Sequence, residues 1–362
     1  MNIVINHRLG KENVENFSGF TLNMKYDSVA STFGFEFYFD PKNKQHSEMA
    51  CVSHYHEAIV EHNGQKLLTG YILSNEFSLE PKKQLVKFGG YSKAGVLEDC
   101  EIPVDQYPLE TNGLSLREIV EKLIKPFTFG FVISGDVPEQ LELSDKVDKK
   151  IEKTNAKESQ NIKSYLSTLL SERNIVLSHN AEGDLVITKP SPNKKPLFTI
   201  SEENGSLPGT KIGMRFNGQG MHSQITVVGQ ASEGNATENT VYNPFVQNVF
   251  RPRVVVQSSG DDITAEQFAK NKLAAELKNI VLTVETDRWE YGGRVVIPGD
   301  IISVISPELY LYKKSDWFVQ DVSLKGDSKK LTAVWTCVPR NVYDGSEVVN
   351  FFVDHGENWG RG

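Results

Sequence analysis

Hydrophobic and polar residues alternate in short runs along the first hundred residues. Between Gly19 and Val104 the runs include FTLNMKYD, FGFEFYFD and KLLTGYILSNEFSL, and turn-forming residues such as Asn63-Gly64 separate them. Short runs of period two between turn signals predict antiparallel strands of a sandwich or barrel. Because Asn-Gly tolerates the positive φ of a type I′ turn, we expect a hairpin at Asn63.

The pattern changes to a helical one near residue 114. Ser115 and Glu118 have the spacing of a capping box, and apolar residues at helical spacing follow as far as Pro126. A second amphipathic pattern runs from Ile162 to Leu170, before two short strand patterns about the turn NAEGD. Residues 135–158 are rich in Asp, Glu and Lys and predict a solvated linker. We therefore predict an inserted α+β domain over residues 105–195.

Strand patterns return after residue 196. Residues 196–345 predict a second β domain with one helix over 263–282, N-capped by Thr264, and a long loop at ASEGNATENTVYNPFVQ. Its final runs, DWFVQDVSL and LTAVWTCV, flank a polar turn and have the layout of KLLTGYILSNEFSL and KQLVKFGG in the first domain. A chance echo between two antiparallel domains is the alternative explanation. The fold prediction is mainly β with an α+β insertion: a first domain over 1–104, the insertion, a second domain over 196–345 and a tail over 346–362.

Composition restricts the possible functions. A length of 362 residues exceeds what one hydrophobic core usually supports. The net charge of -8, with scattered Lys and Arg, argues against a nucleic-acid-binding surface, which needs a cationic stripe. Three widely spaced cysteines are typical of reduced thiols. The chain has neither a secretion pattern at its start nor a run of eighteen apolar residues, so we expect no membrane span.

Motifs that carry chemistry are weak in this sequence. Gly-x-Ser-x-Gly, Cys-x-x-Cys, His-Glu-x-x-His and a helix-opening Gly-x-Gly-x-x-Gly do not occur. The most metal-like stretch is Ser53-His54-Tyr55-His56-Glu57, since His54 and His56 would share one face of a strand. A third ligand is not evident, and Cys51 would face the other side of such a strand. We therefore expect no metal site, no cofactor and no catalytic residues.

Three stretches, taken in order, resemble one family. They are LLTGYILSNEFSLEPKKQLVKFGGYSKAGVLEDCEIP, ESQNIKSYLSTLLSERNIVLSHNAEGDLVITKP, and the region from AEQFAKNKLAAELKNIVLTVETDRWEYGG through DWFVQDVSLKGDSKKLTAVWTCVPRNVYDG. They are similar to the baseplate hub (tail) protein of Mu-like phages and prophages, and more distantly to the hub portion of contractile-tail and type VI secretion spike proteins. The resemblance implies two similar antiparallel β-barrel hub domains and a non-enzymatic homotrimer that joins the sixfold tail tube to the threefold central spike.

The same resemblance implies partners and a location. The partners would be other copies of the chain, the tail tube, the central spike and other baseplate proteins, with DNA only in transit through the channel. The location would be the virion, after assembly in the bacterial host cytoplasm. Alternatives are the hub of a secretion or contractile-injection device, a tail-associated cell-wall hydrolase or carbohydrate-binding protein, and a monomeric β-rich binding protein. The expected assembly-interface residues are Trp317, Phe318, Tyr71, Tyr91 and Trp359.

Overall fold

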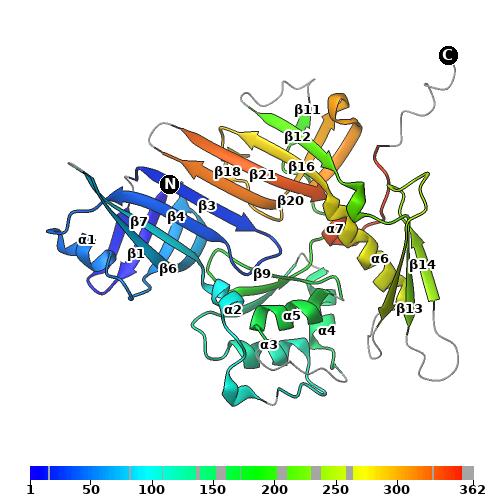
Figure 1. The fold of residues 1–362 in the computed structure, drawn as a ribbon, viewed down its shortest axis with the longest axis horizontal. Helices are drawn as coiled ribbons and strands as arrows, with labels where there is room; N and C mark the ends of the chain where they lie inside the picture. Colours follow the sequence, from blue (N-terminus) through cyan, green and yellow to red (C-terminus); the bar gives the residue numbers. More distant parts are fainter. Residues whose placement is uncertain are drawn as a thin grey trace.

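A computed structural model gives the fold of the chain (Figure 1). It describes residues 1–14, 17–80, 83–107, 109–135, 139–151, 160–171, 173–201, 210–229, 238–257, 264–327 and 330–352. One large sheet dominates the molecule. An α+β unit lies against it, and a long helix with a small separate sheet flanks its other end.

The first half of the large sheet is antiparallel throughout. Its strands follow the order β3-β4-β7-β6-β5-β1-β2, and the short helix α1 (Lys44–Met49) precedes β5. The turn between β5 and β6 has positive φ at Asn63 (48°) and Gly64 (78°), which confirms the predicted hairpin. The strand bounds are Asn2–His7 (β1), Gly10–Val14 (β2), Gly19–Lys25 (β3), Thr32–Tyr38 (β4), Glu57–His62 (β5), Gln65–Glu80 (β6) and Lys83–Ser92 (β7).

The second half continues the same sheet. Its strands follow the order β12-β16-β21-β20-β19-β11, and residues Asp321–Gly326 of β20 pair with β3 of the first half. A two-stranded ribbon, β17 (Glu290–Tyr291) and β18 (Arg294–Val295), lies apart from this path. The bounds are Thr199–Ser201 (β11), Lys211–Phe216 (β12), Ile280–Thr286 (β16), Ile301–Ser306 (β19), Leu311–Gly326 (β20) and Leu331–Pro339 (β21), and the short helix α7 spans Asn341–Asp344.

The two halves repeat one strand order. Going along the chain, β1, β3, β4, β5, β6 and β7 occupy the same sheet positions as β11, β12, β16, β19, β20 and β21. Both β6 and β20 are 16 residues long, and each has a register shift against its following partner, between Ile72 and Ser74 and between Val319 and Asp321. The first strand is the exception, because β1 pairs antiparallel with β5 whereas β11 pairs parallel with β19. The described strands form an open path from β12 to β2, with no closed barrel among them.

The α+β unit has its own hydrophobic core. The capping box of Ser115 and Glu118 is present at the start of α3. Part of the predicted charged linker is a helix, α4, because Leu143 and Val147 are buried on one helical face. Residues 136–138 and 152–159 lie outside the described ranges. The sheet order is β8-β10-β9, and the bounds are Val96–Asp99 (α2), Leu116–Ile124 (α3), Phe131–Ser134 (β8), Glu139–Asp148 (α4), Ile162–Ser171 (α5), Val176–His179 (β9) and Leu185–Thr188 (β10).

A separate sheet, ordered β14-β13-β15, packs on helix α6 (Ala265–Glu276). Thr264 caps this helix as predicted, but the helix is shorter than expected: the chain turns into β16 at Ile280, where buried residues recur with the period of a strand. The predicted long loop is also partly wrong, because it contains β14. The strand bounds are Gln224–Gly229 (β13), Glu238–Tyr242 (β14) and Pro252–Gln257 (β15).

Short 3-10 turns link several elements. They are Lys93–Gly95 (η1), Val104–Gln106 (η2), Gly218–Gly220 (η3), Leu277–Asn279 (η4) and Pro307–Leu309 (η5). Within the described ranges, no helix combines the length and apolar character needed to cross a membrane.

Candidate assembly surface and domain junctions

The two aromatic residues expected at an interface on β20 are core residues. Trp317 and Phe318 are both 0% exposed, and the indole Nε1 of Trp317 donates a hydrogen bond to Ser315 Oγ at 2.9 Å. A side chain without solvent-accessible surface offers nothing to a partner in this conformation, so these two residues are corrected from interface to core. Trp359, which was also expected at the interface, lies outside the described residues.

Tyr71 and Tyr91 hold the large sheet to the α+β unit. They lie opposite each other on β6 and β7 and are half-buried. The Tyr71 hydroxyl lies 2.5 Å from Thr128 Oγ1, and the Tyr91 hydroxyl donates to Asp99 Oδ2 at 2.7 Å. Burial, reinforced by the Asp99 carboxylate, raises the pKa of Tyr91 well above its usual value. Both hydroxyls therefore make contacts within the chain.

Glycine is required where β6 and β7 meet at the bulge. A Cβ atom at Gly90 would lie 2.0 Å from the carbonyl oxygen of Tyr71, and one at Gly70 would lie 2.0 Å from the carbonyl oxygen of Tyr91. These separations are far inside van der Waals contact. The close approach of the two backbones therefore depends on glycine at both positions.

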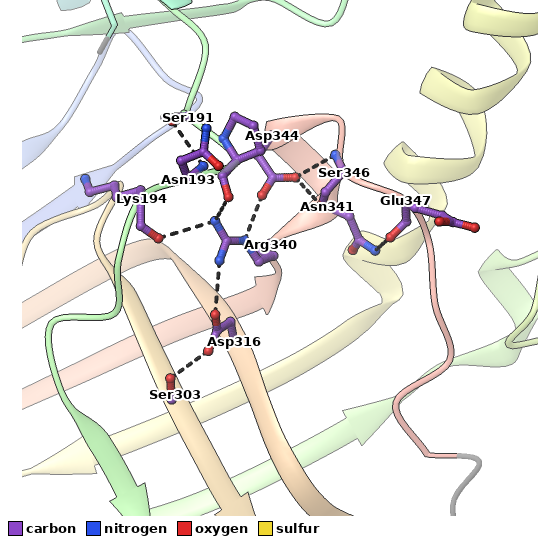
Figure 2. A network of polar contacts seen from close by, with 11 residues as sticks. Ser191, Asn193, Lys194, Ser303, Asp316, Arg340, Asn341, Asp344, Ser346 and Glu347 are labelled. Atoms are coloured by element: carbon purple, nitrogen blue, oxygen red, sulfur yellow. Dashed lines mark hydrogen bonds and ion pairs between the residues drawn. The ribbon is translucent and has the colours of Figure 1, made fainter. Parts of the chain in front are cut away.

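One guanidinium joins three segments that are distant in sequence (Figure 2). Arg340 donates to Asp316 Oδ2 on β20 at 3.0 Å and to Asp344 Oδ2 on α7 at 2.8 Å. Its Nη2 donates to the carbonyl oxygens of Pro192, at 2.6 Å, and Lys194, at 3.3 Å. Arg340 uses several of its donors in charge-assisted or carbonyl hydrogen bonds, which fixes the segment that leaves the α+β unit against the second half of the sheet.

The described part of the tail docks on its own chain. Ser346 donates to Asp344 Oδ1 through both its backbone N–H, at 2.9 Å, and its hydroxyl, at 2.6 Å (Figure 2). Further on, the ring of Phe351 packs edge-on against Trp317, with centroids 5.3 Å apart, and against Phe245, at 5.2 Å. This apolar part of the tail therefore covers part of the main core, and residues 353–362 lie outside the described ranges.

Asp27 joins the first half of the chain to the last. Its Oδ2 accepts from Lys278 Nζ at 2.6 Å, from the Tyr343 hydroxyl at 2.8 Å and from Gln320 Nε2 at 3.4 Å. Burial alone would raise the pKa of Asp27, but the Lys278 charge and these hydrogen bonds outweigh it and hold the pKa below its usual value. Burial raises the pKa of Tyr343, and the Asp27 charge raises it further.

The strand edges of the large sheet that lack a partner among the described residues include those of β12 and of β6 beyond Ser74. Strand β12 pairs only with β16, and β6 beyond Ser74 pairs only with β7, whereas the corresponding part of β20 also pairs with β3. Large apolar side chains are exposed along both edges: Phe77 is 50% exposed, Leu79 80% and Phe216 44%. Unpaired edges with apolar side chains are templates for pairing with another chain.

The His-x-His stretch does not lie on a strand. Residues 51–56 form an irregular segment in which Ser53 (φ 73°) and Tyr55 (φ 48°) are left-handed, so the strand-based prediction for Cys51 is wrong: its Sγ lies 3.6 Å from His54 Nε2. The structure adds Glu48 from α1, which with His54 and His56 forms a group whose possible ligand atoms all lie within 4.8 Å of one another. Glu48 did not stand out in the sequence because a helix, not the expected strand, supplies it.

Comparisons with known proteins identify solved structures that share this fold. No family model and no curated protein matches the chain. Among solved structures, the 43 kDa tail protein of prophage MuSo2 from Shewanella oneidensis superposes with a TM-score of 0.74 at 16% identity, over 95% of this chain and 99% of that one. The chain has the fold of a prophage tail protein. The match confirms, at the level of the fold, the resemblance drawn from the sequence. A tail protein from Neisseria meningitidis MC58 has the same fold, with a TM-score of 0.75 at 16% identity over 95% of this chain and 98% of that one.

The tail-protein fold also extends to a secretion system. A component of the E. coli type VI secretion system, described as structurally similar to the T4 bacteriophage tail proteins gp27 and gp5, has a TM-score of 0.55 at 10% identity. The match covers 90% of this chain and 73% of that one. At such identities the likeness establishes the fold, and function has to be argued from the surfaces of this chain.

Proposed function

We propose that the chain is a structural subunit of a phage tail baseplate hub. Three copies would form a ring in which the two halves of each chain supply six similar modules. Such a ring can join a sixfold tail tube to a threefold spike and leave a channel for DNA. The tail-protein fold and the repeated strand order support this proposal. The observation that most supports the proposal is the pair of exposed strand edges on β6 and β12, because these edges predict the contact that would close the ring.

That contact follows from the junction inside one chain. There β20 of the second half pairs with β3 of the first half. The counterpart of β20 is β6, and the counterpart of β3 is β12. If every junction in the ring is alike, β6 of one subunit pairs antiparallel with β12 of its neighbour. Such a heterologous contact closes when the rotation between subunits is threefold.

The register of the contact is fixed by rows of opposed residues. Asp321 and Ser74 each follow the bulge of their strand. In the second half, the row of opposed residues that starts at Asp321 is Asp321–Thr336–Thr283–Gly213. In the first half, the row that starts at Ser74 is Ser74–Gly89–Gly34–Thr21. Gly213 therefore corresponds to Thr21, and Ser78 corresponds to Lys325, the residue opposite Thr21. The expected opposed pairs between subunits are Asn75–Phe216, Glu76–Arg215, Phe77–Met214, Ser78–Gly213 and Leu79–Ile212.

Three of these five pairs are chemically complementary. Glu76 would face Arg215, which places opposite charges across the strands. On the other face, Phe77 would meet Met214 and Leu79 would meet Ile212. Leu79 is 80% exposed in the single chain, so the contact would bury an apolar side chain that otherwise faces water. The register was derived from backbone pairing alone, so the match of charge and apolarity is an independent argument for it.

Disulfide trapping tests the contact. Opposed residues in antiparallel strands have Cα atoms about 4.5–5.5 Å apart, within reach of a disulfide. In a background with Cys51 and Cys100 changed to Ser, the pair Ser78→Cys and Gly213→Cys should give covalent trimers on mild oxidation. Gly213 has nothing within 4 Å of an added Cβ, so the change is sterically free. Light scattering coupled to size exclusion should report a trimer for the unmodified chain.

Two controls make the result interpretable. The pair Lys325→Cys and Thr21→Cys should crosslink within one chain, because these residues are opposed there. The pair Ser78→Cys and Arg215→Cys is two residues out of register, where Cα separations of about 7–8 Å exceed disulfide reach. A monomer at every concentration, with crosslinking only in the intrachain pair, would exclude a ring that forms without partners and favour a monomeric binding protein.

A secretion or injection-device hub is the second candidate, and the likeness to the E. coli secretion component favours it. Both candidates need the same ring, so trapping does not separate them. Binding does: a phage hub should bind the tube protein encoded beside capsid genes, and a secretion hub should bind a tube protein encoded without them. Release of peptidoglycan fragments by the purified chain in a zymogram would overturn the structural role in favour of a hydrolase.

A further inference from the structure

A compact group of metal-binding side chains lies at the outer end of the first half of the sheet. Glu48 comes from the last turn of α1, His54 from the irregular segment that follows, and His56 from the residue before β5. Each offers one ligand atom, and these atoms lie within 4.8 Å of one another. No residue of this group takes part in the strand pairing of the proposed ring.

The distance between two of the ligand atoms is close to that in a zinc site. Zn²⁺ binds imidazole nitrogen at about 2.0–2.1 Å and carboxylate oxygen at about 2.0–2.2 Å, so two tetrahedral ligands lie about 3.4 Å apart. His54 Nδ1 is 3.7 Å from Glu48 Oε1. A shift of a few tenths of an ångström would bring these two atoms to the separation that the metal imposes. Two imidazoles and one carboxylate, with water in the fourth position, form a known zinc ligand set.

The surroundings orient the ligands. His56 is 8% exposed, and its Nε2 lies 2.8 Å from the carbonyl oxygen of Glu48. When Nε2 donates to this carbonyl, Nδ1 is the deprotonated nitrogen, and a hydrogen bond from the other ring nitrogen is the usual way in which proteins orient a metal-binding histidine. Glu48 and His56 are thus held together before any ion binds.

One oxygen of Glu48 has no hydrogen-bond partner among the described residues. Glu48 Oε1 is buried, and 11% of the side chain is exposed. The other oxygen is 3.5 Å from Arg8, whose side chain is 78% exposed, and such a surface pair contributes little. A buried carboxylate oxygen without a donor is costly, and a bound cation would remove that cost. The left-handed Ser53 and Tyr55, on either side of His54, hold the segment in a conformation that non-glycine residues rarely adopt.

We propose that Glu48, His54 and His56 bind one Zn²⁺ ion, with water as the fourth ligand. The ion ties the irregular segment to α1. Cys51 is not part of this set, because its Sγ lies beside His54 Nε2, on the opposite edge of the ring from the nitrogen that faces Glu48. The site lies close to β6, since Asn75 Nδ2 donates to the carbonyl oxygen of Ala50 at 3.0 Å, but it does not depend on the proposed ring.

Metal titration of the full chain tests the proposal. After treatment with a chelator and its removal, the chain is titrated with Zn²⁺ in competition with a chromophoric chelator, and separately with Co²⁺, whose visible absorption reports tetrahedral coordination. We expect one equivalent bound and intense Co²⁺ bands. Glu48→Gln and His54→Ala should each weaken Zn²⁺ binding by more than about 100-fold, because loss of even an outer-shell partner typically costs 10–100-fold.

His54→Ala is the decisive variant, because this side chain is 44% exposed and its removal should leave the fold intact, as circular dichroism can verify. The matched control is His62→Asn, which removes a histidine that pairs with Glu290 at 3.3 Å, outside the group. Equal affinity in the unmodified chain and His54→Ala would overturn the site and leave a simple contact between Glu48 and His54. An equal loss of binding in His62→Asn would overturn it too, as scattered surface chelation.

Discussion

Charge reversal across the expected β6–β12 contact gives a quantitative test of the ring. Glu76 and Arg215 are both exposed in the single chain, so neither Glu76→Arg nor Arg215→Glu should change its folding. In the ring, each change replaces an attractive cross-strand pair with a repulsive one. Such pairs contribute about 0.2–1 kcal/mol in either direction, so one reversal costs about 1 kcal/mol per contact.

The ring multiplies this effect. Three identical contacts give about 3 kcal/mol for the trimer, which lowers its association constant roughly 150-fold at about 1.4 kcal/mol per factor of ten. Sedimentation equilibrium over a range of concentrations measures this constant. The double variant, Glu76→Arg with Arg215→Glu, restores the attraction with the charges exchanged and should recover most of the loss. Added salt should reduce the difference between single and double variants.

A matched control separates the pair from net charge. Glu121→Arg makes the same charge change as Glu76→Arg on the exposed surface of α3, away from either edge, and should leave association unchanged. Two results would contradict the contact: single reversals that associate like the unmodified chain, or a double variant that loses as much as the sum of the two singles. Either result would mean that the strand register inside one chain does not continue between chains.

Two further predictions concern the stability of one chain. Gly90→Ala places a Cβ 2.0 Å from the carbonyl oxygen of Tyr71 and should lower the free energy of unfolding by about 1–3 kcal/mol or more. Gly213→Ala is the control, because the space around its new Cβ is open, and it should not lower the free energy of unfolding. Thermal unfolding of both variants checks this prediction. Asp27→Asn should cost about 1.5–3 kcal/mol at neutral pH, the range for hydrogen bonds to charged groups, by removing the charge that pairs with Lys278. Folding lowers the pKa of Asp27, so the contribution of its charge to the free energy of unfolding is fully present above its unfolded pKa near 4. That contribution is lost as the pH falls through the lower folded pKa. Denaturant unfolding should therefore find that the difference in free energy of unfolding between Asp27→Asn and the unmodified chain closes below about pH 4.

Local signals in the sequence predicted local structure well. The Asn63-Gly64 turn, the Ser115 capping box and the Thr264 N-cap are present because each depends on residues within four positions of one another. The two long hairpins also pair as expected, β6 with β7 and β20 with β21. The errors arose where apolar periodicity was ambiguous over a few residues. The charged run that contains α4 has only two buried apolar positions in its helix, too few to stand out from a solvated linker.

The structure departs from the predictions for Trp317, Phe318 and the His-x-His stretch for a different reason. A strand buried on one face and a strand at an interface have the same alternation, so Trp317 and Phe318 could not be assigned to core or interface from sequence. Their burial depends on the tail, since Phe351 covers Trp317, and on long-range strand pairing. Glu48 was missed because its approach to His54 depends on the turn between α1 and β5. Such contacts are set by tertiary structure, which no residue pattern encodes locally.

The two halves of the chain differ most in what is inserted into them. The α+β unit follows β7, whereas α7 follows the counterpart strand β21 in the described part of the chain. The sheet β14-β13-β15 and α6 lie between β12 and β16, whereas β3 and β4 are joined by a short turn. In the proposed ring the strand modules would occur six times, but each insertion would occur three times. A face built from the modules would then match a sixfold partner, and a face that carries the insertions would match a threefold one. The symmetry change would therefore reside in the insertions, and the sheet would remain free to keep nearly equivalent contacts around the ring.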